Sequence, residues 1–181
     1  MRVLVEHGHA GASTLQIQRE AGVSRGRLLH QFASREALLV AAVSHLASIY
    51  MTSSGQLSAS LPDSSQDRVN AAVTDMWANY QQDHFWAATE LWLAARHHPA
   101  LAEALRPVEH VVGERVRAAT DSYFGPTLCD HPDYRATREL LNTSMRGVAL
   151  TYAFNGRRDR MADDTHLPQW RDLASRSLLD P

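Results

Sequence analysis

The side chains best suited to chemistry in this sequence gather within seven residues. They are Arg25, Arg27, His30 and Gln31, which follow closely on a predicted helix start. Arginine can form two hydrogen bonds with a guanine edge, glutamine can do the same with adenine, and the major groove of duplex DNA admits one α-helix. Gly26 costs about 1 kcal/mol in a helix relative to alanine, so close approach to a surface is a plausible reason for it. The pattern predicts a helix that reads DNA bases.

Two short helices joined by a tight turn must hold these side chains. Ser13 is a favourable N-cap and Gln16 completes a capping box, so we predict a helix over residues 14–21. Gly22 supplies the backbone freedom that ends this helix. Ser24 then caps a second helix that begins at the next residue. This order of elements is typical of a helix-turn-helix.

Apolar residues at helical spacing define the buried faces of the pair. Ile17 and Ala21 share one face of the first helix, and Leu28 and Phe32 share one face of the second. Many helical proteins carry such a capped pair with surface arginines and never contact nucleic acid. From the pattern alone, that interpretation and DNA binding both stay open.

A longer stretch, from Gly8 to Leu39, resembles the DNA-binding domain of TetR-family transcriptional regulators. The shared positions are Gly8, His9, Ser13, Ile17, Ala21, Gly22, Val23, Ser24, Gly26, Leu28, Phe32, Ser34, Arg35, Glu36, Ala37, Leu38 and Leu39. The rest of the chain is similar to the family in helical pattern and length. The resemblance implies an all-α protein with an N-terminal three-helix helix-turn-helix DNA-binding domain. A C-terminal helical domain for ligand binding and dimerisation would follow.

The resemblance also implies which residues contact DNA. Expected contacts to the DNA backbone come from Ser13, Thr14, Ser24 and Arg35; for Arg35 the alternative is a solvated surface arginine. Expected contacts to the bases come from Arg25, Gly26, Arg27 and His30, with Gln31 beside them.

Three features depart from the family pattern. Leu29 stands where the family usually has a phosphate-contacting tyrosine. Gln18 replaces a small residue, so we expect either a rotated first helix or an outward-facing Gln18. The family's helix 1 begins well before Met1, and we therefore expect the native start to lie upstream. A mass measurement on protein from the native source would test this expectation.

Composition limits the class of protein. The chain has 181 residues, 44% of them hydrophobic, with no apolar run long enough for a membrane span and no signal-peptide core. We therefore predict a cytoplasmic protein without membrane contact. Cys129 is the single cysteine, which excludes an intrachain disulfide and a cysteine-rich metal site. Net charge is −2, yet residues 1–50 hold five arginines against three acidic residues, so the positive excess lies with the helix-turn-helix.

Turn-forming and helix-breaking residues indicate a boundary within the chain. Ser, Gly, Pro and Asp dominate residues 53–65, which predicts a boundary between a DNA-binding domain at 1–52 and a helical effector-binding and dimerisation domain at 53–181. We expect Pro107 to kink or divide a long helix. The expected helices of the second domain cover residues 67–82, 84–97, 100–123, 133–154 and 168–179.

Large rings and methionines in the second domain could line a ligand cavity or fill the core. The effector-binding candidates are Met76, Tyr80, Trp92, His110 and Met145. The last two helices carry more apolar surface than they can hide alone, which predicts a homodimer interface, with packing inside one chain as the alternative. The interface candidates are Leu141, Met145, Val148, Tyr152, Trp170 and Leu173.

Enzyme and metal signatures are weak. His97 and His98 are adjacent, and His7 and His9 are two residues apart, so neither pair has the spacing of helical metal ligands. No catalytic or nucleotide-binding motif is present, and we predict no cofactor, no metal and no enzymatic activity. The resulting hypothesis is a homodimeric repressor that leaves a palindromic operator when it binds a small apolar or aromatic effector. The alternative is a protein-interaction adaptor whose helix-turn-helix no longer binds DNA.

Overall fold

The structure, a computed structural model, describes residues 2–53, 58, 60–155, 161 and 163–179. These residues form helices and no strand, which confirms the all-α fold class. Contacts divide the chain into two compact units. The first comprises Met1–Tyr50 with Asp83–Arg115, and the second Met51–Gln82 with Val116–Pro181. None of the described helices is long and apolar enough to cross a membrane.

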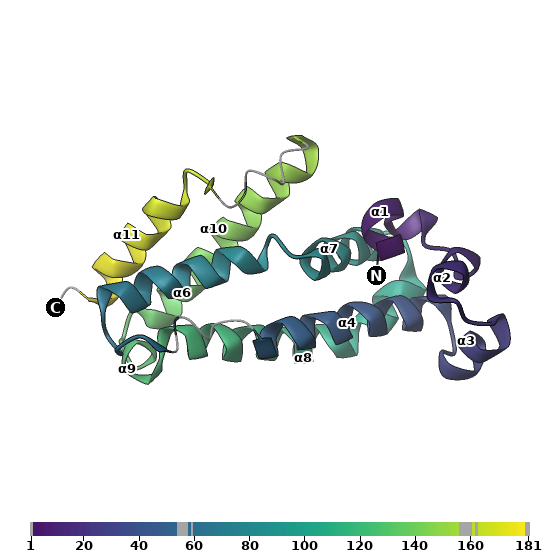
Figure 1. Ribbon diagram of the computed structural model, residues 1–181, viewed down its shortest axis with the longest axis horizontal. Helices are drawn as coiled ribbons and strands as arrows, with labels where there is room; N and C mark the ends of the chain where they lie inside the picture. Colours follow the sequence, from purple (N-terminus) through teal and green to yellow (C-terminus); the bar gives the residue numbers. More distant parts are fainter. Residues whose placement is uncertain (1, 54–57, 59, 156–160, 162, 180–181) are drawn as a thin grey trace. The chain divides into compact units, whose positions relative to one another are not determined.

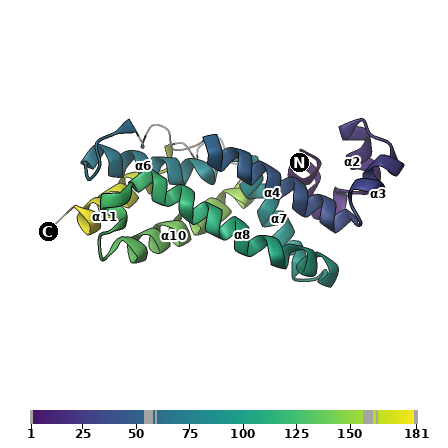
Figure 2. The ribbon, with the colours of Figure 1, turned by 90° about the horizontal axis from the view of Figure 1, so that it is seen from below.

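The first unit is built around the N-terminal helices. Its elements are α1 (Arg2–Gly11), α2 (Thr14–Ala21), α3 (Arg25–Gln31), most of α4 (Arg35–Ser53), α7 (Asp83–Ala95) and residues 99–115 of α8 (Pro99–Phe124). Helix α1 packs along α7 (Figure 1). The core between them contains Leu4, Leu39 and Leu91, each nearly inaccessible to solvent. Helices α2 and α3 adjoin each other at the turn (Figure 2), and Ile17 of α2 packs against this core.

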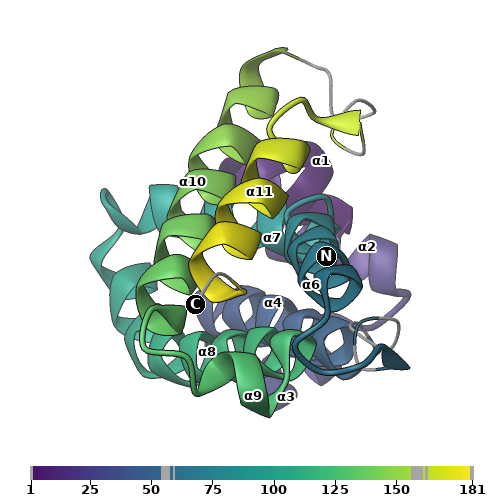
Figure 3. The ribbon, with the colours of Figure 1, turned by 90° about the vertical axis from the view of Figure 1, so that its left-hand side faces the viewer.

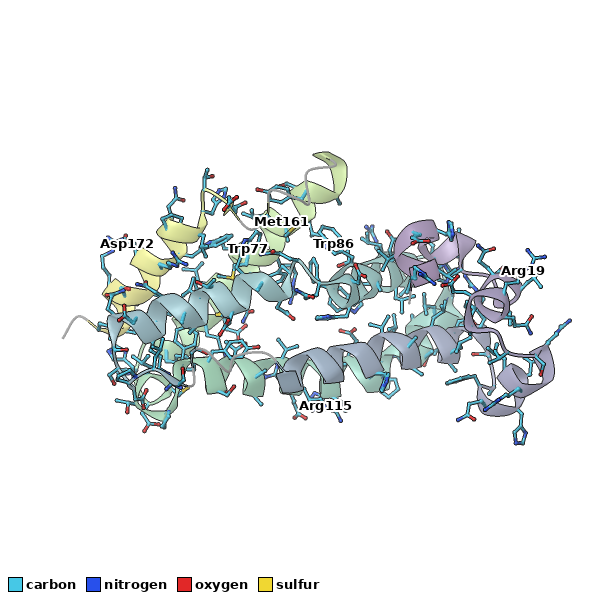
Figure 4. All side chains as sticks on the ribbon, in the orientation of Figure 1. Arg19, Trp77, Trp86, Arg115, Met161 and Asp172 are labelled. Atoms are coloured by element: carbon cyan, nitrogen blue, oxygen red, sulfur yellow. The ribbon has the colours of Figure 1, made fainter. Side chains whose placement is uncertain are left out.

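The second unit consists of helices, and the last helix of the chain packs against two of the others. It contains α6 (Gln66–Asn79), the end of α8, α9 (Pro126–Cys129), α10 (Tyr134–Asn155) and α11 (Leu167–Leu178). Helix α11 lies along both α6 and α10 (Figure 3). Trp77 is buried at this junction, where its indole N–H donates to the Met161 carbonyl at 2.5 Å (Figure 4). Its ring stacks at a tilt against Trp170, with centroids 4.8 Å apart.

A buried arginine closes the end of α8 in the second unit. The Arg68 guanidinium donates to three backbone carbonyls, those of Leu61, Ser122 and Tyr123, at 3.0 to 3.1 Å. The last carbonyls of a helix lack intrahelical partners, so these bonds satisfy groups that would otherwise be buried without one. Gly125 follows with φ of 85°, and a Cβ there would lie 2.7 Å from the Arg68 guanidinium.

Most expected helices are confirmed to within a few residues at their ends. Helix α8 continues through Pro107, so the expected division there is wrong, and the alternative of a kink stays a prediction. The expected loop after α8 contains the short helix α9, and Ser58 in the expected boundary segment is helical. Residues 54–57 and 59 of that segment lie outside the described residues, and the two-domain boundary stays a prediction.

Candidate nucleic-acid interface

The helix-turn-helix forms as its capping residues predicted. The Ser13 hydroxyl accepts from the Gln16 backbone N–H at 3.2 Å, and the Ser24 hydroxyl accepts from the Arg27 backbone N–H at 3.3 Å. Gly22 adopts the left-handed conformation, with φ of 63°, that ends α2. Both helix starts and the turn between them are therefore fixed by local sequence.

Burial along the two helices is lopsided. Leu28 is the buried residue of α3, with 7% of its surface exposed, while Ala21 of α2 is exposed and its predicted burial is wrong. Gln18 is partly buried, which excludes the outward-facing arrangement. Seven residues make about two turns, so one buried position leaves most of α3 at the surface.

The surface of α3 collects the residues predicted to contact bases. Its exposed residues are Arg25, Gly26, Arg27, Leu29, His30 and Gln31. Residues two positions away from Leu28 point roughly opposite to it, since each residue turns the helix by about 100°. Gly26 and His30 therefore occupy the outermost line of α3. Arg25 and Arg27 form no ion pair with any residue in the described part of the chain.

Arg35 forms hydrogen bonds within the protein. Its Nε donates to the Ala12 carbonyl at 2.8 Å, Nη1 lies 3.1 Å from His9 Nε2, and Nη2 donates to the His9 carbonyl. A Glu36 carboxylate oxygen lies 3.5 Å from Nη1. Arg35 thus ties the end of α1 to the start of α4. The sequence offered no local sign of this, because the partners are more than twenty residues away.

A shallow cleft of about 450 Å³ opens at the N-terminus of α2. Its lining residues are His9, Ala10, Ser13, Thr14, Arg35 and His98. The rings of His9 and His98 are 4.9 Å apart. Burial lowers the pKa of His9, and the nearby Arg35 and His98 lower it further, partly opposed by Glu36 and Glu90. The lining residues include no carboxylate and the N-terminus of α2 adds partial positive charge, while Glu36 and Glu90 lie close enough to act on His9. His98 was not among the predicted residues.

The predicted effector residues fall into both units. Met76, Tyr80 and Met145 are buried in the second unit, whereas Trp92 and His110 belong to the first. Trp92 donates to the Glu109 carboxylate. His110 is exposed and lies 3.1 Å from a carboxylate oxygen of Glu114. The structure therefore does not gather all five residues within one unit.

A small cavity of about 10 Å³ adjoins Met76. Asn79, Val116, Ala119, Thr120, Tyr123 and Asn142 complete its lining. Nearby, the Tyr80 hydroxyl donates to the Asn142 carbonyl at 3.0 Å, and burial raises the pKa of Tyr80 to about 12. A volume of this size holds one water molecule.

The predicted dimer residues also divide. Leu141 and Met145 are fully buried within the chain and Trp170 is 4% exposed, so these three follow the alternative of packing inside one chain. Val148, Tyr152 and Leu173 are partly exposed, and Leu140 beside them is 54% exposed. Tyr152 donates its hydroxyl proton to the buried carboxylate of Asp164. These residues of α10 and α11 stay at least partly exposed, and the dimer interface stays a prediction.

Other candidate chemistry gains little from the structure. Among the described residues, no three His, Cys, Asp or Glu side chains gather closely enough to hold a metal ion. Burial raises the pKa of the Cys129 thiol, which disfavours the reactive thiolate. The exposed polar face of α3 is the described surface with the clearest role.

The two capped helices and the turn between them form a helix-turn-helix in an all-α chain. Arg25 and Arg27 are exposed on its second helix, as expected for a DNA-binding protein of this class. Residues 1–42 match the family model described as bacterial regulatory proteins of the tetR family. This match supports a DNA-binding transcriptional regulator of the TetR type and confirms the resemblance inferred from the N-terminal residues, while residues 43–181 lie outside the match. Regulators of this family are generally not enzymes. A search of curated proteins and a search of solved structures each found no match.

Proposed function

We propose that the protein is a cytoplasmic, homodimeric repressor that binds a palindromic operator and is released by a small apolar or aromatic effector. The observation that carries the proposal is the surface of α3. This helix exposes Arg25, Arg27, His30 and Gln31 without an ion pair to either arginine among the described residues. Free arginine donors match the acceptors of a guanine edge.

Contacts to the DNA backbone would come from the turn and from α2. Ser13, Thr14 and Ser24 stand at the two helix N-termini, where backbone N–H groups and the helix dipole favour a phosphate. The cleft bounded by His9 and His98 gives such a phosphate room beside α2. Arg35 would act by positioning α1 against α4, since its donors are engaged within the protein.

Two copies are needed because one copy offers little contact. A seven-residue helix reaches few base pairs, and the excess positive charge of residues 1–50 is only two. Two recognition helices about 34 Å apart would enter successive major grooves of a palindrome. Val148, Tyr152 and Leu173, with Leu140, supply partly exposed apolar surface for a two-fold interface.

Effector binding in the cavity beside Met76 would require movement of helices in the second unit. The cavity beside Met76 holds no more than a water molecule, so an aromatic molecule fits only if the lining of α6, α8 and α10 separates. A ligand that binds a moved state better than the resting state shifts the population toward it. We propose that the moved state sets a spacing between the two recognition helices that no longer fits the operator.

The test is a mobility-shift titration with the DNA upstream of the protein's own gene. Repeated between 50 and 200 mM salt, it should show affinity falling by about a thousandfold or more if some six phosphates are contacted. A scrambled duplex of equal length and composition is the control. Binding that is absent, or equal for both duplexes, would contradict the proposal.

An adaptor that binds another protein is the second candidate, and Leu29 favours it. This leucine is half exposed on α3, and an exposed apolar side chain can pack against a protein partner. Replacing Arg25 and Arg27 with alanine separates the two functions. Operator binding would be lost, whereas binding to an apolar protein surface would survive.

A further inference from the structure

Leu29 is the apolar residue on the exposed surface of α3. Half of its surface is open to solvent, while the other exposed residues of the helix are polar, charged or glycine. A surface that must enter an aqueous, charged groove gains nothing from an isolated leucine unless the groove offers an apolar group.

The neighbours of Leu29 leave it accessible. Gly26 is three residues earlier and Arg25 is four, so both are adjacent to Leu29 on the helix surface. A Cβ at Gly26 would meet no atom within 4 Å. The glycine therefore leaves an open space beside the leucine, and the helix backbone can approach a partner there.

Duplex DNA carries one apolar group on the base edges of its major groove. That group is the C5-methyl of thymine, and apolar side chains distinguish thymine by packing against it. Leucine has no hydrogen-bonding atom, so it cannot contact a phosphate oxygen or a base nitrogen in the way its polar neighbours can.

We propose that Leu29 is a specificity-determining residue that packs against a thymine C5-methyl in each half-site. The inference rests on the proposed function, because it requires α3 to lie in the major groove. Because Leu29 is adjacent to Arg25 and Gly26 on the helix surface, this thymine should lie next to the base pair that Arg25 contacts. Two half-sites make two such contacts per dimer.

The experiment removes methyl groups and leaves base pairing unchanged. The full chain is titrated against the upstream duplex and against the same duplex with every thymidine replaced by deoxyuridine, first together and then one position at a time. Burying one methyl-sized group contributes about 0.8 kcal/mol, which is close to fourfold in affinity. The two symmetric positions together should therefore cost about fifteenfold in affinity.

Leu29→Ala supplies the second arm. This variant should bind the thymine duplex more weakly and distinguish it from the deoxyuridine duplex by less than twofold. Leu15→Ala is the matched control, because Leu15 is an exposed leucine on α2, 56% accessible, and the variant should keep the full preference for thymine. The ratio measured on the unaltered chain needs no variant and so does not depend on variant folding.

Each result decides something. Equal affinity of the unaltered chain for both duplexes, or an undiminished preference in Leu29→Ala, overturns the role of Leu29 and leaves the proposed function standing. Failure of the unaltered chain to bind any duplex overturns the proposed function, and this inference with it. The proposal is supported if the unaltered chain and Leu15→Ala both prefer the thymine duplex and Leu29→Ala does not.

Discussion

Arginine has two different roles in this protein, and Arg68 of the second unit and the arginines of α3 in the first unit are the two extremes. In the second unit, Arg68 is 7% exposed and all its guanidinium nitrogens donate to backbone carbonyls. Arg138 is similarly covered and contacts Asp121 at 2.7 Å. In the first unit, Arg25 and Arg27 are exposed. Buried Arg68 and Arg138 stabilise the fold, whereas Arg25 and Arg27 form no ion pair among the described residues, so substitutions in the two sets should change different measurements.

The largest expected effect on stability is at Arg68. Arg68→Leu leaves three carbonyl groups without their donor, and an unsatisfied buried acceptor costs about 1–3 kcal/mol. We expect the free energy of unfolding to fall by about 3 kcal/mol or more in a urea titration. Arg106→Leu is the control, since Arg106 is exposed and, in the described part of the chain, its ion pair is with Glu103 of the same helix. A loss below about 1 kcal/mol for Arg68→Leu would refute the capping role.

Gly125→Ala tests the packing around the Arg68 guanidinium from the neighbouring backbone. The new Cβ would lie 2.7 Å from both the Arg68 guanidinium and an Asp63 carboxylate oxygen, on a backbone with φ of 85°. Such strained conformations cost about 1–3 kcal/mol in residues other than glycine. We expect a loss of about 2 kcal/mol in urea, with DNA affinity of the folded protein unchanged. Gly147→Ala, where a Cβ meets no atom within 4 Å, should cost nothing.

Ser24→Ala tests the start of the recognition helix. Loss of the bond to the Arg27 N–H should cost about 1 kcal/mol of stability and weaken DNA binding. Ser24→Asp is the informative partner, because aspartate also caps a helix but brings a negative charge toward the DNA phosphates. It should keep the thermal midpoint and lose DNA affinity. If Ser24→Asp binds DNA as well as the unaltered chain, Ser24 does not face the duplex.

The smallest expected effect concerns His9. Because its pKa in the folded chain is below the ordinary 6.5, the unfolded chain binds a proton more readily. Stability should be complete above pH 6.5 and fall as the pH drops below it toward the folded value. His9→Gln keeps an acceptor for Arg35 and removes the titration, so its urea midpoint should change less between pH 7.5 and 5.5.

Local features of the helix-turn-helix were predictable from the sequence because their causes are local. Ser13, Gly22 and Ser24 act within four residues of themselves, and each adopts its expected conformation. Arg35 could not be placed in this way, because its carbonyl partners on His9 and Ala12 belong to a different helix end. The contact depends on how α1 and α4 pack.

The second domain shows a further limit of sequence patterns. Leu141 and Trp170 carry the same apolar signal whether they face their own chain or a second copy, and here they are buried within the chain.

Pro107 shows a different limit, because a residue that usually breaks a helix is tolerated inside α8. Leu101 and Leu105 just before it are buried in the core of the first unit, and this packing favours the helix despite the lost hydrogen bond.

The central claim is that α3 binds DNA through its free arginines, and affinity of the double variant Arg25→Ala, Arg27→Ala tests it most directly. Each lost base contact is worth about 1–3 kcal/mol, so a dimer lacking four should bind the upstream duplex at least a hundredfold more weakly. Its thermal midpoint should be unchanged, and Arg106→Ala should bind normally. Undiminished affinity of the double variant for that duplex would contradict the account.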